Sequence, residues 1–327
     1  MSAALRLGLL STARINDRIL DGARSSDAVD VVAVGSRDAA RAQAYANGHG
    51  IERAHGSYEA LLADDDVDAI YISLPNGLHH EWTLAALRAG KHVLCEKPYS
   101  RRAGEVEEAF AEAAERGLVL TEAFMYRHHP QSRRVRQLVD DGAVGRVRLI
   151  RSAFSFPLAD PTDVRAQPEL DGGALMDVGC YCVSGSRLLA GEPERVLGEE
   201  VRGTTGIDEA FHGILRFPGD VVGQFDCSFA LPVRQELEVL GEEGVLRVGA
   251  PWRIDWGGEV TLHREDGAER IEIPEGDAYR LELENLATAV RGLGAPLLDR
   301  ADALGQARTL EALYRSAETG RPVSLER

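Results

Sequence analysis

Paired cysteines, long apolar runs and a surplus of basic residues are all absent from this sequence. Its four cysteines are too few and too irregularly spaced for a disulfide framework. Cys180 and Cys182 lack both the spacing and the His or Cys partners of a zinc site. We therefore expect reduced thiols, no metal and a cytoplasmic location.

The same absences narrow the range of partners. No apolar run approaches the roughly 18–20 residues of a membrane span, and the N-terminal MSAALRLGLL, interrupted by Arg6, is not a secretory signal. The 53 acidic residues outnumber the 37 basic ones, and the formal charge of −16 repels phosphate backbones and anionic lipid surfaces. We therefore expect no nucleic acid and no membrane as partners, but a small-molecule ligand.

Two patterns of elements predict two domains in the 327 residues. Up to Tyr126, short apolar strands alternate with amphipathic helices, which is typical of a doubly wound parallel sheet. Beyond it, eight strand-like runs between Val147 and Ile273 are separated by turn signals, which predicts an antiparallel sheet. Helices are expected at Leu175–Leu189, Arg280–Arg291 and Asp302–Thr319. The predicted division is a Rossmann α/β domain at residues 1–124 and an α+β domain at 125–327.

The turn after the first strand is where a dinucleotide fingerprint, G-x-G-x-x-G, would stand. The sequence there reads Ser11-Thr12-Ala13-Arg14-Ile15-Asn16, with small residues at the first two glycine positions. Small side chains let the backbone approach a pyrophosphate at a helix N-terminus, and the Ser11 and Thr12 hydroxyls could add hydrogen bonds. An ordinary strand–helix turn is the alternative.

The end of the second strand bears on the choice of cofactor. NAD-specific domains place an acidic side chain there for the ribose 2′-hydroxyl, whereas this sequence has Ser36 and Arg37. A guanidinium can grip a phosphate through two hydrogen bonds, which favours NADP over NAD. The alternative is that Arg37 is a solvated loop charge. Asp38 follows, but as a helix cap it need not face the ribose.

Lys97 stands at the end of the fifth strand, in Cys95-Glu96-Lys97-Pro98. The carboxyl ends of parallel strands border the ligand crevice. An ammonium there can polarise a carbonyl or lower the pKa of a neighbouring hydroxyl. Taken alone, a lysine before a proline can equally be an ordinary loop residue.

Several blocks, taken in order, resemble the glucose–fructose oxidoreductase, inositol dehydrogenase and rhizopine-catabolism (Gfo/Idh/MocA) family. They are GLLSTARI, SRD, SLPNGLHHEWTLAALRAGKHVLCEKP, EAFMYRHHP, GGALMDVGCYCV and AETGRPV, and they cover nearly the whole chain. The resemblance implies a Rossmann domain followed by a large open, mainly antiparallel sheet. Relatives often dimerise through this sheet, so we expect a homodimer or a higher homo-oligomer.

The resemblance also implies the cofactor contacts. Glu96 and Lys97 would lie beside the nicotinamide, with Lys97 reaching the reacting substrate oxygen, and the Lys97–Pro98 bond is a candidate cis peptide. The nicotinamide ribose and phosphates would be lined by Leu74, Pro75, Asn76 and His79. With the residues above, the predicted cofactor site comprises Ser11, Thr12, Ala13, Arg14, Ile15, Ser36, Arg37, Leu74, Pro75, Asn76, His79, Glu96 and Lys97.

The second catalytic block departs from the pattern D-x-G-x-H of many relatives. Here it reads Asp177-Val-Gly-Cys-Tyr181, so a tyrosine replaces the histidine. The two residues are four apart and share one helix face. This variant resembles the branch that contains NADP-dependent D-xylose 1-dehydrogenases and dimeric dihydrodiol dehydrogenases. We predict Lys97, Asp177 and Tyr181 as catalytic residues; the alternative for Tyr181 is a core aromatic.

Four further residues are candidates for substrate contact. Tyr126 and Arg127 open the second domain and should face the cleft. Phe156 is either a core residue or a stacking wall for a sugar ring. Arg165, in a loop before Gly172-Gly173, either binds substrate hydroxyls or is a solvated charge.

Together these features predict an NADP-dependent dehydrogenase, with NAD less suited, acting on a CH–OH group of a sugar or cyclic diol. An aldose 1-dehydrogenase that forms a lactone is one example. A keto-sugar reductase and a sugar–sugar oxidoreductase with a tightly held cofactor are alternative enzymes. A non-catalytic, dinucleotide-binding regulatory protein is the alternative of another class.

Overall fold

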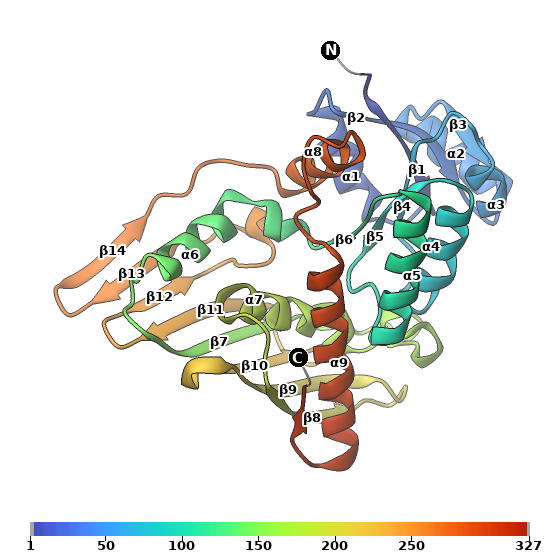
Figure 1. The fold of residues 1–327 in the computed structure, drawn as a ribbon. Coiled ribbons are helices and arrows are strands. Elements are labelled where there is room, and N and C mark those ends of the chain that lie inside the picture. Colours follow the sequence, from blue (N-terminus) through green and yellow to red (C-terminus); the bar gives the residue numbers. More distant parts are fainter. Residues whose placement is uncertain (1–2, 326–327) are drawn as a thin grey trace. The chain divides into compact units, whose positions relative to one another are not determined.

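The computed structural model describes residues 3–325, which pack as two compact units (Figure 1). The first contains the described residues up to 128 together with 277–304. The second contains 129–276 together with those from 305 onwards. Within residues 3–325, no helix combines the length and the apolar character needed to cross a membrane.

The first unit is a Rossmann fold with six parallel strands in the order β3-β2-β1-β4-β5-β6. The strands are β1 (Leu5–Leu10), β2 (Val29–Gly35), β3 (Arg53–His55), β4 (Ala69–Ile72), β5 (His92–Glu96) and β6 (Leu120–Ala123). The connecting helices are α1 (Asn16–Arg24), α2 (Ala39–His49), α3 (Tyr58–Leu62), α4 (His79–Arg88) and α5 (Ala103–Arg116). The predicted doubly wound sheet is confirmed. Strand β3 has only three residues, all half-buried, a pattern too short to be predicted from the sequence.

Local signals set where these helices begin and end. Asp38 caps α2, since its carboxylate accepts a hydrogen bond from the backbone nitrogen of Arg41 at 2.9 Å. Gly117 ends α5 with a φ of 67°, a left-handed conformation that glycine adopts without strain. The chain then enters β6 directly. Residues at or next to the helix ends therefore set both boundaries.

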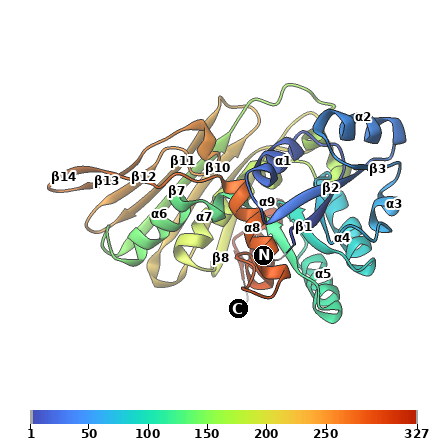
Figure 2. The same ribbon diagram turned by 90° about the horizontal axis from the view of Figure 1, so that it is seen from above.

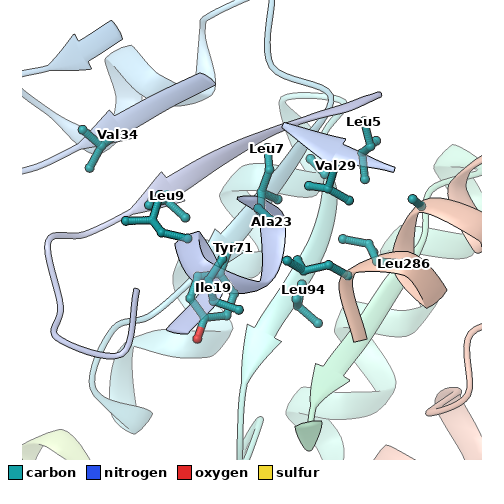
Figure 3. Close-up of a cluster of buried hydrophobic side chains, with 14 of the residues drawn as sticks. Leu5, Leu7, Leu9, Ile19, Ala23, Val29, Val34, Tyr71, Leu94 and Leu286 are labelled. Carbon is teal, nitrogen blue, oxygen red and sulfur yellow. The ribbon is translucent and has the colours of Figure 1, made fainter. Parts of the chain in front are cut away.

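The core of the first unit includes a helix from the far end of the sequence (Figure 3). Leu7, Leu9 and Tyr71 pack with Leu286 of α8 (Ala278–Val290). Helix α8 lies against α1 so closely that a Cβ on Gly22 would be 2.9 Å from the backbone nitrogen of Arg280. The division predicted at residue 124 follows the order of elements along the chain. It did not anticipate that α8 completes the first core, because helix periodicity does not say which core a helix covers.

The second unit contains a nine-stranded sheet in the order β14-β13-β12-β11-β7-β10-β9-β8-β15. All neighbours are antiparallel except β7 and β10, which confirms the predicted, mainly antiparallel sheet. The strands are β7 (Val147–Ser155), β8 (Arg195–Arg202), β9 (Asp208–Arg216), β10 (Val222–Ser228), β11 (Arg234–Gly241), β12 (Val245–Val248), β13 (Val260–Arg264), β14 (Gly267–Ile271) and β15 (Val323–Ser324).

Helices cover one face of this sheet. The helices α6 (Pro130–Asp140) and α7 (Cys180–Ala190) lie along it, with α7 against β7 and β10 (Figure 2). From residue 305 onwards, α9 (Arg300–Thr319) packs on β8 and β9, where a Cβ on Gly198 would meet the carbonyl oxygen of Leu313 at 2.6 Å. On β9, Phe211 is fully buried under these helices, whereas Ile214 points to the opposite, exposed face.

The core of the first unit also contains an acidic side chain. Glu282 on α8 is only 2% exposed, and its Oε1 has no hydrogen-bond partner within residues 3–325. Burial, with a smaller contribution from the negative charge of Glu96, raises the pKa of Glu282 well above its ordinary value of 4.5. Ionising this group in the fold therefore costs stability.

Replacing Glu282 by Gln should stabilise the protein at neutral pH. The unfolded chain ionises this carboxyl near pH 4.5, whereas the fold resists ionisation until a higher pH. The cost is therefore absent below pH 4.5 and develops as the pH rises towards the raised value. At about pH 7.5 we expect E282Q to raise the melting temperature by about 2–4 °C, with the gain lost near pH 4.5.

Melting curves across this pH range would measure the effect. Glu115→Gln on the exposed side of α5 is the matched control and should change little. An E282Q variant no more stable than the parent at neutral pH would contradict the prediction.

Candidate functional site

The turn after β1 has the backbone geometry of a dinucleotide-binding turn. Ser11, at the first glycine position of the fingerprint, has a φ of 140°, a conformation that favours glycine. Its hydroxyl accepts a hydrogen bond from the backbone nitrogen of Ala13 at 3.1 Å and lies 2.8 Å from Ser73 Oγ. The Asn16 side-chain amide donates to Ser11 O at 2.8 Å. The Ser11 hydroxyl thus stabilises the turn, and its predicted contact with the cofactor stays a prediction.

Two exposed guanidinium groups border this end of the sheet. Arg14 follows β1 and Arg37 follows β2, and these strands pair with Leu10 opposite Gly35. Within residues 3–325, the guanidinium of neither arginine has a hydrogen-bond or ion-pair partner. The carboxylate of Asp38 is occupied as the cap of α2. This end of the sheet therefore fits an anionic ligand that carries a phosphate, as the sequence predicted for NADP.

The loops after β4 and β5 are joined by a buried histidine. The ring nitrogens of His79 lie 2.8 Å from the carbonyl oxygen of Leu74 and 3.0 Å from that of Pro98. Burial lowers the pKa of His79 below 6.5, although both carbonyl groups oppose this shift. A neutral imidazole donates from one nitrogen only. Since both nitrogens face backbone, His79 acts on the predicted cofactor site by holding these two loops.

Glu96 and Lys97 stand at the carboxyl end of β5, as predicted. The Tyr71 hydroxyl, on β4, donates to Glu96 Oε1 at 2.5 Å, and the backbone nitrogen of Lys97 donates to Glu96 Oε2 at 3.2 Å. Tyr71 is buried, so it fixes the orientation of the carboxylate. The Lys97–Pro98 peptide bond is cis, as predicted.

The sheet gathers the rest of the predicted cofactor residues at this same end. Leu10 of β1 pairs with Ile72 of β4, and Ile72 pairs with Cys95 of β5. The segments after these strands are therefore neighbours. Ser36 is buried at the end of β2. The half-buried residues of the set are Thr12, Ala13, Ile15, Leu74, Pro75, Asn76, Glu96 and Lys97.

Two of the predicted substrate residues have partners inside the first unit. Tyr126 is buried, with its ring edge-on to Phe124 at 6.1 Å. The Arg127 guanidinium forms an ion pair with Asp302 at 3.0 Å. These contacts show how both side chains are held, and their proposed contact with substrate stays a prediction.

The second unit carries Asp177 and Tyr181 on a helix that begins with a π-helical turn. Leu175–Gly179 is π-helical, and the backbone nitrogen of Cys180 donates to Leu175 O, five residues back. An uninterrupted helix was predicted here. Residues 177 and 181 remain close to one turn apart, so they still lie on one side of the helix.

Arg165 forms an ion pair with Asp177. Its Nε lies 3.1 Å from Asp177 Oδ2, and its Nη1 lies 3.0 Å from Asp163 Oδ2. The same guanidinium is 5.9 Å from the centre of the Phe156 ring, and the Phe156 ring packs 5.2 Å from Phe229. Arg165 thus pairs with a predicted catalytic carboxylate. Phe156 packs against both this guanidinium and the ring of Phe229.

Sequence reasoning missed two tryptophans next to these aromatic side chains, the buried Trp252 and the exposed Trp256. The Tyr181 ring lies 5.5 Å from Phe154 and 6.2 Å from Trp252. Trp256, which is 44% exposed, lies edge-on to Phe154 at 6.2 Å. Two of the three tryptophans of the chain stand within five residues of each other, a signal that could have marked this loop.

The cysteines contribute no nucleophile to this arrangement. All four are buried and none forms a disulfide. Burial raises the pKa of Cys182 to about 12, so this thiol stays protonated. Over residues 3–325, no cluster of three or more His, Cys, Asp or Glu side chains could hold a metal ion.

Known proteins share both halves of this architecture. Residues 8–124 match an oxidoreductase family described by its NAD-binding Rossmann fold, and residues 132–247 match the GFO/IDH/MocA C-terminal domain. D-xylose 1-dehydrogenase (NADP(+)) 2 of Haloferax volcanii is 40% identical over 98% of this chain and 100% of its own length. Trans-1,2-dihydrobenzene-1,2-diol dehydrogenase of Xenopus laevis is 36% identical over 91% of this chain and 94% of its own length.

A solved structure extends the similarity to three dimensions. The 3-ketoreductase of Actinomadura kijaniata, in complex with NADP and TDP-benzene, superimposes with a TM-score of 0.90 at 33% identity. The match covers 96% of this chain and 98% of the other. With both domain models and the full-length relatives in agreement, this chain belongs to the GFO/IDH/MocA family of oxidoreductases.

Proposed function

We propose that this protein is an NADP-dependent oxidoreductase that transfers hydride between the nicotinamide and a CH–OH carbon of a sugar or cyclic diol. The observation that carries the proposal is the position of Glu96 and Lys97. They stand at the carboxyl end of β5, the same end of the sheet as the Ser11 turn and Arg37. The NADP-dependent D-xylose dehydrogenase and the diol dehydrogenase support the reaction type.

The residues of the first unit would hold the cofactor. Ser36 and Arg37 would bind the 2′-phosphate, because Arg37 is exposed and the Asp38 carboxylate is occupied. The backbone of the Ser11–Ala13 turn would face the pyrophosphate at the start of α1. When bound, the nicotinamide supplies the acceptor for the hydride.

Three side chains would handle the proton and the charge on the substrate oxygen. Tyr181 accepts the hydroxyl proton, and Lys97 stabilises the negative charge that develops on that oxygen. A free tyrosine has a pKa near 10, so a tyrosine that acts as a base at neutral pH needs a cation close to its hydroxyl. Asp177, held by Arg165, orients a neighbouring substrate hydroxyl.

The second unit supports a ring-shaped polyol as substrate. Trp256, 44% exposed, offers an aromatic ring on which the apolar face of a substrate ring can pack. Phe154 lies edge-on behind it, and Tyr181 packs beside Phe154; these two side chains are 5% and 6% exposed. Arg165 and Asp177 supply the hydrogen-bonding groups that ring hydroxyls require. Sugars and cyclic diols combine both kinds of surface.

We also propose a homodimer formed through the open face of the second sheet, in the cytoplasm. Leu197 on β8 and Ile214 on β9 are direct neighbours on this face, and they are 37% and 43% exposed. Adjacent apolar side chains on a sheet face gain stability when a second copy covers them. The buried thiols support a reducing compartment.

The direct test is absorbance in the NADPH band with NADP and a panel of aldopyranoses and a cyclic trans-diol, repeated with NAD. We expect NADPH to form with one substrate class and NAD to serve poorly. Lys97→Met should lower turnover by about 100- to 10,000-fold while NADP affinity stays nearly unchanged. If no substrate of the panel yields NADPH although NADP binding is demonstrated, the proposal is contradicted. A fully active K97M variant would contradict it as well.

The same assay run in reverse separates the alternatives. Oxidation of NADPH only with keto-sugars would identify a reductase. Cofactor that stays bound through purification would identify a sugar–sugar oxidoreductase.

Arg37→Asp should change the preference between the two cofactors. Loss of the phosphate grip and the added negative charge should raise the KM for NADP by about 100-fold, as expected for a lost charge-assisted contact. The KM for NAD should change little. Arg41→Asp, exposed one turn later on α2, is the matched control. An unchanged ratio of the two KM values in R37D would refute the assignment of Arg37.

Ile214→Glu should weaken the proposed dimer, because it places a charge opposite its own copy or among apolar neighbours. Sedimentation analysis should show a dimer for the parent chain and a shift to monomer for I214E. Leu293→Glu, which replaces a 76% exposed leucine in the first unit, should leave the dimer intact. A monomeric parent chain, or a dimer unaffected by I214E, would refute this interface.

A further inference from the structure

The proposed reaction leaves the buried carboxyl group of Asp208, in the second unit, unused. Asp208, the first residue of β9, is 4% exposed. Its Oδ2 accepts a hydrogen bond from the backbone nitrogen of Leu175 at 2.6 Å, and its Oδ1 accepts one from the Tyr314 hydroxyl of α9 at 3.0 Å. Each carboxyl oxygen therefore accepts a hydrogen bond. One of the two donors, Leu175, is at the start of the helix that carries Asp177 and Tyr181.

A pair of glycines lets the chain close tightly around this carboxyl. Gly173 has a φ of 130°, and a Cβ there would lie 2.0 Å from Asp208 Oδ1. A Cβ on Gly172 would lie 2.4 Å from the carbonyl oxygen of Arg165. That carbonyl accepts a hydrogen bond from the Gly173 backbone nitrogen at 2.9 Å. Only glycine fits at either position without a backbone shift.

The same turn determines where Asp177 and its partner stand. The backbone nitrogen of Asp177 donates to Gly173 O at 3.0 Å, so the helix begins from this turn. Arg165 is attached at both ends, through its carbonyl to Gly173 and through its guanidinium to Asp177. Asp208 thus holds the turn at Gly173–Leu175, which is hydrogen-bonded both to the helix of Asp177 and to the Arg165 loop.

We propose that Asp208, held by Tyr314, is a positioning residue that places Asp177, Arg165 and Tyr181 for catalysis through the Gly172–Leu175 turn. It does not touch the substrate. The inference rests on the proposed function, because it assigns roles to residues of that reaction. Loss of the anchor would let the helix start and the Arg165 loop move together, and a displacement of about 1 Å can lower a rate by about 100-fold.

The surroundings of Asp208 indicate which substitution should be tolerated. Burial raises the pKa of Asp208 to about 7, against the lowering effect of the Leu175 and Tyr314 hydrogen bonds. The other titratable or charged groups that act on it are Glu200 and Arg202 on β8 and Cys227 on β10. An asparagine is neutral and of the same shape. Its oxygen can accept from Leu175, and its amide can donate to the Tyr314 hydroxyl.

The test compares Asp208→Ala, Asp208→Asn and Tyr314→Phe by steady-state kinetics, NADP binding and hydrogen exchange of residues 173–181. We expect D208A to lower kcat by about 100-fold, with faster exchange of this segment and NADP affinity within about twofold of the parent. D208N should recover kcat to within about threefold, and Y314F should lie between the two. This split between kcat and NADP affinity, with rescue by Asn, would not follow from general destabilisation.

The proposal would be overturned by a D208A variant that keeps its kcat, or by folded D208A and D208N variants that lose kcat equally. If D208A fails to fold, unchanged kcat and unchanged exchange in Y314F would overturn it. A parent chain without dehydrogenase activity would instead defeat the proposed function itself. The two failures are distinguishable, because the first requires an active parent.

Discussion

Pairing of β1 with β2 on one side and β4 on the other is the constraint on which the cofactor end of the molecule depends. Because these strands are parallel, Leu10 stands level with Gly35 and Ile72, and the segments after them meet at one edge. The Ser11 turn, Arg37 and the Leu74–Asn76 loop come together for that reason alone. β5 extends the same edge and adds Glu96 and Lys97. No side-chain contact could substitute for this register, since a parallel sheet sets the level of every strand end at once.

Polar groups in this protein are held by partners that do no chemistry themselves. Tyr71 orients Glu96, and His79 joins the loops that follow β4 and β5. In the second unit, Arg165 holds Asp177, and Asp208 holds the turn from which both extend. A side chain that the fold already holds in place does not have to lose conformational freedom when the substrate binds. Its orientation therefore adds little to the free-energy barrier of the reaction.

The sequence allowed a role to be predicted for residues that stand in short motifs or within four positions of each other. The Glu96-Lys97-Pro98 motif, the Asp177–Tyr181 pair and the absence of an acidic residue at the end of β2 all depend on local order. Arg165 could not be assigned, because its partner Asp177 is twelve residues away across an irregular loop. Trp256 and Asp208 were missed for the same reason. Their neighbours Phe154, Leu175 and Tyr314 lie far away in the sequence.

The sequence by itself determined the alternation of strands and helices, the parallel sheet, the antiparallel sheet and the motifs at the strand ends. Periodicity and turn residues act over a few positions, so they can be recognised without knowledge of the fold. Only the tertiary structure decided that α8 completes the first core, that the Ser11 hydroxyl bonds to Ser73, and that Asp208 anchors the helix of Asp177. Each of these depends on contacts between distant segments, and such contacts exist only after the chain has folded.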